Sequence, residues 1–260
     1  MILINGNLSV DKISLDSGFF FGRGVFETIL VKEKPIFLEA HIQRLNRGLK
    51  TLNVNKEITE AEIYTGVEKL CCKNCVLKIM VSEKNTIITK REISYKYNDY
   101  EQGFSLGLSE VRRNAHSNLT YVKSFNYVEN IIEREKIIKK GYNEALFLNT
   151  EGFISEGAVS NIFFEQNGII FTPKIKCGLL PGIIRNFIIQ NSLSIGLEIQ
   201  EGEFTLDKLM KAQGIFITNS VMGIMKINKI GDKTINESVI VSQIKRYYDS
   251  YIEDYRNKVT

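Results

Sequence analysis

Short apolar runs rich in β-branched and aromatic residues recur through the first half of the chain, and such runs are typical of strands. Between them, one segment shows apolar residues every three or four positions, which predicts a helix over residues 39–52. Thr59 followed by Glu62 is a capping box, which predicts a second helix that runs toward Lys73. The strands predicted here cover residues 1–4, 8–15, 25–31, 36–38, 76–82, 86–89 and 104–109.

The second half mixes the same two patterns. A helical period over residues 125–140 ends at Gly141, a residue that suits a left-handed C-cap. Asn167-Gly168 predicts a hairpin turn, and Pro181 fits the first turn of another helix. Further strands are predicted at 144–149, 153–155, 161–165, 169–172, 197–201 and 214–218, and a terminal helix at 237–255.

Residues 110–120 are polar and follow neither period, so this stretch is the best candidate for a linker. A chain of 260 residues is long enough for two modest domains. The patterns predict an α+β protein with two lobes: a smaller α/β lobe at 1–112, a linker at 113–121, and a larger lobe at 122–260.

Composition narrows the class of protein. Apolar residues make up 43% and charged residues 25%, which is ordinary for a globular protein, and the net charge of +4 is scattered. Nucleic-acid binding would favour a clustered basic face, so we expect none. No apolar run reaches the length of a membrane span, and Met1–Ile4 is too short for a signal peptide, so we expect a cytoplasmic protein without membrane contact.

The chain has four cysteines, and Cys72 and Cys75 form a C-x-x-C pair. No second pair accompanies them, and a zinc site would need four ligands at recognisable spacing. Reduced thiols near a helix end are the simpler interpretation. A non-catalytic redox or metal-binding protein built on this pair is the hypothesis from another class, and it predicts no chromophore.

Two residues stand out by their surroundings. Lys123 lies among Tyr121, Val122 and Phe125 rather than in a run of charges, whereas most lysines are solvated surface groups. Glu156 lies between Ile154 and Gly157-Ala158, and small neighbours would let a flat ring approach it. A sheltered lysine and a lone acid are suited to holding an aldehyde cofactor at both ends.

Five motifs, in order along the chain, resemble those of the fold-type IV pyridoxal-phosphate enzymes, the superfamily of branched-chain and D-amino-acid aminotransferases and aminodeoxychorismate lyases. The resemblance spans nearly the whole chain. It implies the two-lobed fold of that superfamily, with a β-barrel-like second lobe, and pyridoxal 5'-phosphate as the cofactor. The motifs are Gly24–Thr28, His41–Leu45, Lys123–Tyr127 with Glu156–Phe163, Leu180–Arg185 and Thr218–Gly223.

By this resemblance Lys123 is the catalytic residue that forms the Schiff base with the cofactor. Glu156 would pair with the pyridine nitrogen and keep it protonated. Tyr127 lies four residues after Lys123, so a helical turn would place both on one side, where the hydroxyl could meet the ring oxygen. A core aromatic on a helix face is an equal alternative for Tyr127.

The resemblance also implies a phosphate site. Arg44 can supply a guanidinium fork, and the amides of Ile183 and Ile184 lie at a helix start, where the helix dipole favours anions. Ser220 could add a hydroxyl. The superfamily often has threonine at the position of Ile184, so only the backbone contact is carried over there. Asn161 resembles a position near the site, or simply holds a turn.

The motifs around Lys123 and Thr218–Gly223 look closest to the aminodeoxychorismate lyases. The implied reaction is elimination of pyruvate from 4-amino-4-deoxychorismate to give 4-aminobenzoate, a step in folate biosynthesis. An aminotransferase acting on D-amino acids or branched-chain amino acids is the alternative. The segment that would carry a carboxylate-binding arginine is altered here, and Arg91 is either such a ligand or a solvated charge.

The resemblance finally implies a homodimer that acts on a small anionic substrate. The aromatic loop Phe19-Phe20-Phe21 is a plausible part of such an interface, although core packing would explain it equally well.

Overall fold

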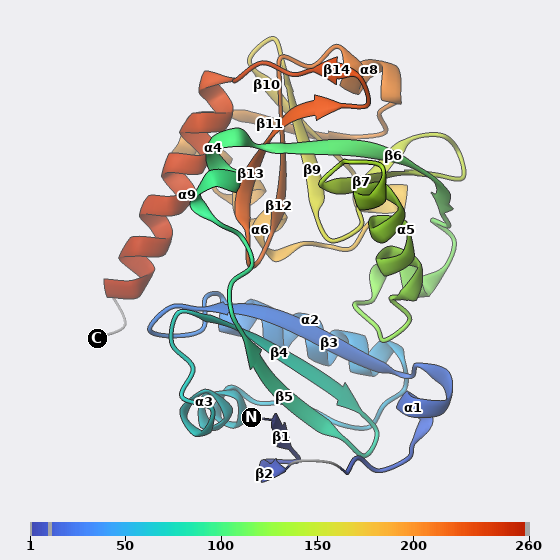
Figure 1. The fold of residues 1–260 in the computed structure, drawn as a ribbon, viewed down its shortest axis with the longest axis vertical. Coiled ribbons are helices and arrows are strands. Elements are labelled where there is room, and N and C mark those ends of the chain that lie inside the picture. Colours follow the sequence, from blue (N-terminus) through green and yellow to red (C-terminus); the bar gives the residue numbers. More distant parts are fainter. Residues whose placement is uncertain (1, 10–11, 258–260) are drawn as a thin grey trace. The chain divides into compact units, whose positions relative to one another are not determined.

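The computed structural model describes residues 2–9 and 12–257 (Figure 1). The chain divides into two compact units. Unit 1 comprises Met1–Ser94, Val122–Tyr127 and Asp254–Thr260, and unit 2 comprises Tyr95–Tyr121 and Val128–Glu253. Each unit has its own sheet and its own buried apolar cluster, so each is described by itself.

Unit 1 is built on a five-stranded antiparallel sheet with the order β2-β1-β5-β4-β3. Its strands are β1 (Ile2–Ile4), β2 (Asn7–Ser9), β3 (Gly24–Val31), β4 (Cys75–Ser82) and β5 (Thr86–Arg91). Its helices are α1 (Ser17–Phe21), α2 (Leu38–Thr51) and α3 (Glu60–Lys69). The predicted capping box at the start of α3 is confirmed, since Thr59 and Glu62 bond each other's backbone amides.

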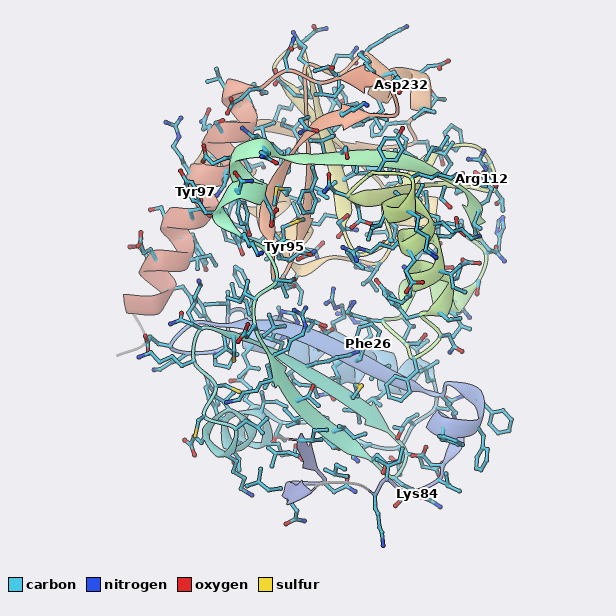
Figure 2. All side chains as sticks on the ribbon, viewed as in Figure 1. Phe26, Lys84, Tyr95, Tyr97, Arg112 and Asp232 are labelled. Atoms are coloured by element: carbon cyan, nitrogen blue, oxygen red, sulfur yellow. The ribbon has the colours of Figure 1, made fainter. Side chains whose placement is uncertain are left out.

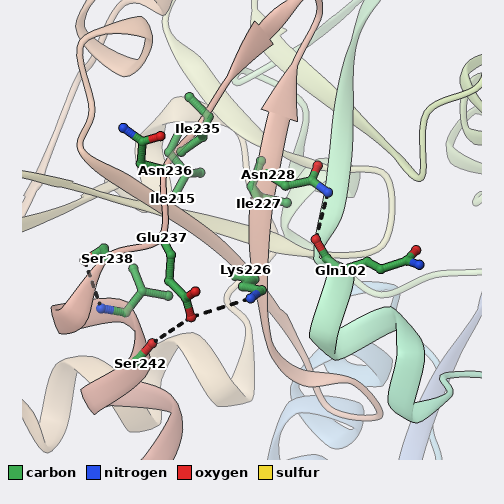
Figure 3. Close-up of a pocket in the computed structure, with 11 residues that line it drawn as sticks. Gln102, Ile215, Lys226, Ile227, Asn228, Ile235, Asn236, Glu237, Ser238 and Ser242 are labelled. Atoms are coloured by element: carbon green, nitrogen blue, oxygen red, sulfur yellow. Dashed lines mark hydrogen bonds and ion pairs between the residues drawn. The ribbon is translucent and has the colours of Figure 1, made fainter.

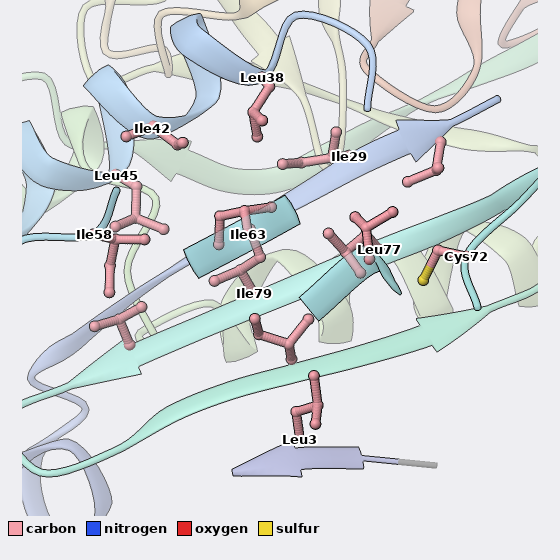
Figure 4. Close-up of a cluster of buried hydrophobic side chains, with 14 of the residues drawn as sticks. Leu3, Ile29, Leu38, Ile42, Leu45, Ile58, Ile63, Cys72, Leu77 and Ile79 are labelled. Atoms are coloured by element: carbon pink, nitrogen blue, oxygen red, sulfur yellow. The ribbon is translucent and has the colours of Figure 1, made fainter. Parts of the chain in front are cut away.

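Alternation along β3 decides which side chains face the helices. Val25, Ile29 and Val31 point into the cluster that α2 and α3 cover, because successive side chains of a strand point to opposite faces. Figure 4 shows this cluster, in which helix residues such as Leu45 and Ile63 meet the sheet. The opposite face of β3 carries Phe26, Thr28 and Leu30.

Unit 2 is built on a nine-stranded mixed sheet with the order β11-β10-β9-β12-β13-β6-β7-β8, and β14 pairs with β13. Its strands are β6 (Phe104–Arg113), β7 (Glu144–Asn149), β8 (Ile154–Gly157), β9 (Asn161–Gln166), β10 (Ile169–Pro173), β11 (Glu198–Gly202), β12 (Gly214–Asn219), β13 (Gly223–Ile230) and β14 (Lys233–Thr234). Its helices are α4 (Tyr97–Gln102), α5 (Val128–Lys139), α6 (Ile183–Gln190), α7 (Ser192–Ile195), α8 (Leu206–Met210) and α9 (Val239–Asn257), whose last residues are grouped with unit 1.

Phenylalanines fill much of the interior of unit 2. The rings of Phe163 and Phe216, on the neighbouring strands β9 and β12, stack with centroids 4.8 Å apart. Phe164, Phe171 and Phe204 form a second group, with centroids 5.3–5.4 Å apart. Aromatic pairs of this kind add to the stability that burial provides. These ring contacts therefore bind neighbouring strands of the sheet to one another.

The structure places the domain boundaries differently from the expectation. Residues 95–112, expected in the first lobe, belong to unit 2, because β6 pairs in parallel with β7 and β13. The expected linker at 113–121 contains the end of β6 and a 3₁₀ turn at Asn118–Tyr121. Val122–Tyr127, expected in the second lobe, belongs to unit 1, because it pairs with β3.

Three local expectations were also wrong. The strand expected at 36–38 is absent: Pro35 forms only an isolated bridge to Val31, and α2 begins at Leu38. The strand expected at 8–15 ends at Ser9 in β2; residues 10–11 lie outside the described part, and residues 12–16 form no strand. Side chains organise this segment instead, since Asn85 bonds the backbone of Ser14 and Asp16 caps α1. The helix expected from residue 125 begins only at Val128. None of the described helices is both long enough and apolar enough to span a lipid bilayer.

Candidate functional site

The predicted site residues fall into two groups. Arg44, Lys123 and Tyr127 belong to unit 1. The predicted residues of unit 2 are Glu156, Ile183, Ile184 and Ser220.

Lys123 lies on a short extended segment that pairs with the edge strand β3. The amide of Phe26 donates to the carbonyl of Lys123 at 2.9 Å, and the amide of Phe125 donates to the carbonyl of Gly24 at 2.9 Å. Gly24 is required here, because a Cβ at this position would lie 2.4 Å from the Phe125 ring. Backbone pairing, rather than a helix, therefore fixes the direction of the Lys123 side chain.

Two aromatic rings lie beside the Lys123 amine. Its Nζ is 4.3 Å from the centre of the Phe26 ring and 5.0 Å from that of Tyr127, and the two rings meet edge to face at 5.1 Å (Phe26 is labelled in Figure 2). The expectation that Tyr127 and Lys123 share one side is met, although the expected helical turn is absent. A half-buried amine over aromatic faces is partly shielded from water, as a nucleophilic lysine needs to be.

Arg44 lies on α2 above a buried carboxylate that the sequence did not single out. Glu27 is 1% exposed and accepts bonds from Arg44 Nε at 2.7 Å and Nη2 at 2.8 Å. Its second partner is His41, whose Nδ1 lies 2.7 Å away. Burial raises the pKa of Glu27, but the charge and hydrogen bonds of Arg44, with those of His41, outweigh it and hold the pKa well below its usual range.

The state of His41 follows from its surroundings. Burial lowers its pKa, and the positive charges of Arg44 and Lys123 act in the same direction, which outweighs the attraction of Glu27. The imidazole is therefore neutral near pH 7, and because ionised Glu27 can only accept, Nδ1 carries the proton. Nε2 has no hydrogen-bond partner among the residues that the structure describes.

In unit 2, Glu156 ends up buried at the end of β8, with 7% exposure. Its Oε2 accepts the amide of Leu180 at 2.9 Å, and its Oε1 lies 3.4 Å from Nε of Arg113. The Arg113 guanidinium also lies over the Phe147 ring, with its central carbon 3.8 Å from the ring centre. These contacts fix the orientation of the Glu156 carboxylate.

The start of α6 lies close to Glu156, because Leu180, three residues before the helix, donates its amide to the Glu156 carboxylate. Asn161 donates to the carbonyl of Leu180 at 2.9 Å, so one residue is bonded by both Glu156 and Asn161. Gly182 is the N-cap, and no side chain caps the helix. The first amides of a helix have no partner within it, so those of Ile183 and Ile184 can bind an anion.

Ser220 follows β12 directly and is half-buried. The turn that carries it is organised by Asn219, whose Oδ1 accepts the amides of Val221 at 3.0 Å and Met222 at 2.7 Å. Thr218, two residues earlier on β12, is buried, and its hydroxyl has no hydrogen-bond partner within the described residues.

Sequence reasoning missed Glu27 and Arg113. Arg113 lies in the expected linker, and no sequence signal marked it, because its place at the end of β6 follows from pairing with the distant strand β7. Glu27 lies in an otherwise apolar run, where a lone acid predicts a buried partner.

A separate pocket of about 130 Å³ lies between β13 and the start of α9 (Figure 3). The ion pair of Lys226 and Glu237, with 3.5 Å between the charged atoms, lies at its edge above an apolar floor that includes Ile215 and Ile227. None of the predicted site residues lines it.

Comparison with known proteins identifies the family. Residues 24–230 match the amino-transferase class IV family. The chain is 31% identical to the aminodeoxychorismate lyase of Bacillus subtilis over 88% of this chain and 86% of that protein. It is 29% identical to a candidate branched-chain-amino-acid aminotransferase of Methanocaldococcus jannaschii, over 99% and 96%.

A solved structure agrees with these relatives. A candidate 4-amino-4-deoxychorismate lyase of Legionella pneumophila superposes with a TM-score of 0.85 and 26% identity, covering 93% of this chain and 96% of that one. The predicted fold class is confirmed, as is the predicted cofactor, since enzymes of this family depend on pyridoxal phosphate.

Each unit carries groups of the kinds that this cofactor requires. Unit 1 offers a half-buried lysine beside aromatic rings, and unit 2 offers a fixed carboxylate and a helix start with uncapped amides. An amine for the aldehyde, an acid for the ring nitrogen and amides for the phosphate are the groups that it requires. When bound, the cofactor supplies an electron-withdrawing ring next to the substrate amine. The chain belongs to the amino-transferase class IV family of pyridoxal-phosphate enzymes.

Proposed function

We propose that this enzyme is an aminodeoxychorismate lyase, which eliminates pyruvate from 4-amino-4-deoxychorismate to give 4-aminobenzoate for folate biosynthesis. The 31% identity to the Bacillus subtilis lyase supports this choice. The observation in the structure that carries it is a cationic face around Phe26, because this substrate bears two carboxylates.

That face belongs to the side of the unit 1 sheet that lies opposite α2 and α3. Lys78 on β4 has its Nζ 5.1 Å from the centre of the Phe26 ring, the same ring that Lys123 approaches. Arg91 shares this face, since Lys78 pairs with Thr89 and Arg91 lies two residues further along β5. Burial, and then the charge of Arg91, lower the pKa of Lys78. Two lysines near one ring, with Arg91 further along the same face, suit a dianionic substrate.

In the proposed reaction Lys123 acts as catalytic base and acid. Its amine removes the proton from the carbon that bears the substrate amine, the bond from the neighbouring carbon to the enolpyruvyl oxygen breaks, and Lys123 returns the proton to the departing group. Pyruvate leaves and the remaining ring becomes aromatic, so atoms and charge balance. With the cofactor bound, Glu156 would hold a proton at the pyridine nitrogen, and Tyr127 would bond the ring oxygen.

Arg44, Ser220 and the amides of Ile183 and Ile184 hold the phosphate in this proposal. Arg44 already donates from Nε and Nη2 to Glu27, so it contributes mainly a fixed positive charge. The helix start of α6 then supplies directional hydrogen bonds.

The test separates the lyase from an aminotransferase, the second candidate, which the Methanocaldococcus jannaschii relative favours. Purified enzyme is given 4-amino-4-deoxychorismate, and pyruvate is measured. Parallel reactions contain D-alanine or leucine with 2-oxoglutarate. We expect pyruvate from the first reaction and slow turnover in the others; rapid amino-acid turnover without pyruvate would replace the lyase by the aminotransferase.

The matched variants are Lys123→Ala and Lys78→Gln. Lys123→Ala should abolish the visible absorbance of the lysine-linked cofactor. It should also lower the activity by at least about 10³-fold. Lys78→Gln should keep that absorbance and raise KM for the dianionic substrate about tenfold, because one charge contact is lost. Unchanged KM would remove Lys78 from the substrate site.

We also propose that the enzyme works as a homodimer in the cytoplasm. Phe19, Phe20 and Phe21 are 60–78% exposed on the short helix α1. Asp16 caps this helix at one end and Gly22, with φ +67°, at the other, so the rings are held outward on an ordered turn. A contiguous apolar patch of this kind is typical of an interface.

A further inference from the structure

Glu144 is a buried acid to which neither the sequence nor the proposed reaction assigns a role. It lies at the start of β7 with 2% exposure. Its Oε1 accepts the amides of Ala145 at 3.1 Å and Ala158 at 2.9 Å, and the amide of Val159 also bonds this carboxyl. Glu144 therefore holds the backbone that directly follows Glu156.

The Ala158 peptide is held from its other side as well. Asn130 Nδ2 donates to the carbonyl of Ala158 at 2.7 Å, and Asn130 Oδ1 accepts from Arg113 Nη1 at 3.2 Å. Arg113 Nε is in turn 3.4 Å from Glu156 Oε1. With the backbone from Glu156 to Ala158, these contacts close a ring, so a movement of Ala158 must move the Glu156 carboxylate or break a contact.

The segment has little room to absorb such a movement. A Cβ at Gly157 would lie 2.1 Å from Ser160 Oγ and 3.2 Å from Glu144 Cγ. Close packing of this kind transmits a displacement rather than damping it.

Charge makes this ring sensitive to protons. Burial raises the pKa of Glu144 to about 7, although Arg134 and the three backbone amides favour the ionised form. Of the packed elements, α5 contributes Arg134, and β6 contributes Arg113, which is engaged with Asn130 and Glu156. Strand β8 contributes Glu156 itself, and the loop after it contributes amides and the Ser160 hydroxyl.

We propose that Glu144 is a positioning residue for Glu156: its buried carboxyl binds the backbone amides of Ala158 and Val159 and so holds the segment that orients the Glu156 carboxylate. The role rests on the proposed function in so far as Glu156 holds the cofactor ring. Opening this segment lets water reach Glu144 and returns its pKa toward the ordinary 4.5. Linkage then requires the equilibrium constant for opening of this segment to increase about tenfold between about pH 6 and about pH 8.5.

The test measures amide hydrogen exchange of Ala158 and Val159 in the cofactor-free protein at these two pH values, corrected for the intrinsic rate. Protection should fall about tenfold in the unmodified protein. In Glu144→Gln the protection of both amides should be the same at the two pH values, because the carboxamide keeps an acceptor and cannot ionise. Glu165→Gln is the matched control: Glu165 is another buried acid of unit 2, bonded to Ser238 and outside the ring, and this variant should behave like the parent.

A second arm adds saturating pyridoxal phosphate. If Glu156 holds the cofactor, binding should protect both amides at both pH values and flatten the pH dependence. Cofactor that binds to Lys123 without protecting them would overturn the positioning role while leaving the proposed function intact. Cofactor that does not bind at all would remove the proposed function. The exchange data on the cofactor-free protein would still test whether Glu144 holds the Ala158 segment.

Three results would overturn the positioning role of Glu144. Protection in the unmodified protein could be independent of pH, Glu144→Gln could retain the parent's pH dependence, or both amides could exchange only with global unfolding. The measurements on the unmodified protein decide the matter even if Glu144→Gln does not fold.

Discussion

Glu27 shows how one buried side chain fixes Arg44, the phosphate-binding residue predicted in unit 1. It is buried, and its partners Arg44 and His41 both come from α2. Without Glu27, the Arg44 guanidinium would lose the acceptor that fixes its direction. The ion pair of Glu27 and Arg44 thus fixes the orientation of the Arg44 guanidinium.

We predict that Glu27→Gln lowers the free energy of unfolding by about 2 kcal/mol, because breaking a buried ion pair leaves the partner charge poorly compensated, and the partial exposure of Arg44 moderates the cost. Urea denaturation of the cofactor-free protein measures it. Glu33→Gln is the control: it removes the ion pair with Lys73, whose side chains are 42% and 65% exposed, and should change stability by less than about 0.5 kcal/mol. Equal effects in the two variants would contradict the buried-pair account.

Glu144 should also make the free energy of unfolding of the whole protein depend on pH. Its folded-state pKa of about 7 lies above the ordinary 4.5, so the folded protein binds an extra proton between these values. The contribution of Glu144 to stability is therefore fully present below about pH 4.5 and is lost as pH rises to about 7. We predict a loss of about 2 kcal/mol from this group between about pH 5.5 and about pH 8.5.

The measurement compares denaturation of the parent and Glu144→Gln at both pH values. The carboxamide cannot ionise, so the difference in stability between the two proteins should shift by that amount in favour of the variant at the higher pH. Parallel pH curves for the two proteins would show that Glu144 is ionised throughout.

At the scale of elements, the start of α6 depends on a close approach between two segments. A Cβ at Gly182 would lie 1.8 Å from Asn161 Oδ1, and Asn161 holds the carbonyl of Leu180 before the helix. The N-cap glycine thus allows the helix start and β9 to fit together. The position of the anion-binding amides follows from this fit.

We predict that Gly182→Ala weakens pyridoxal-phosphate binding about tenfold, because displaced amides lose roughly the equivalent of one charge-assisted hydrogen bond. Titration of the cofactor-free protein followed by absorbance measures the affinity. The double variant Gly182→Ala with Asn161→Ala should bind as well as Asn161→Ala alone, since truncation removes the clash. An additive loss would show that the Asn161 contact is not the cause.

At the scale of the whole molecule, the exposed rings of α1 make a second copy of the chain the proposed partner. We predict that replacing Phe20 and Phe21 by serine converts a dimer into a monomer, because the interface would lose two of its apolar anchors. Sedimentation velocity measures the state. Leu193→Ser, at a residue 91% exposed on α7, is the control and should leave the dimer intact. A parent protein that sediments as a monomer would contradict the proposal.

Much of the fold could be predicted from local signals. The capping box at Thr59, the turn at Asn167-Gly168 and the period of α2 each depend on residues close in sequence. The boundary between the units could not, because it depends on which strands pair. Strand β6 joins β7 and β13 across distant sequence, and no pattern within residues 104–113 specifies that choice.

The sequence by itself determined the family, the cofactor and the residue types for the chemistry, because each motif is a short run whose meaning does not depend on distant partners. Only the tertiary structure decided how those residues are held. Backbone pairing with β3 aims Lys123, the Leu180 amide and Arg113 fix Glu156, and burial gives Glu144 a pKa near neutrality. Desolvation and hydrogen-bond geometry arise between segments far apart in the chain, so they exist only once it is folded.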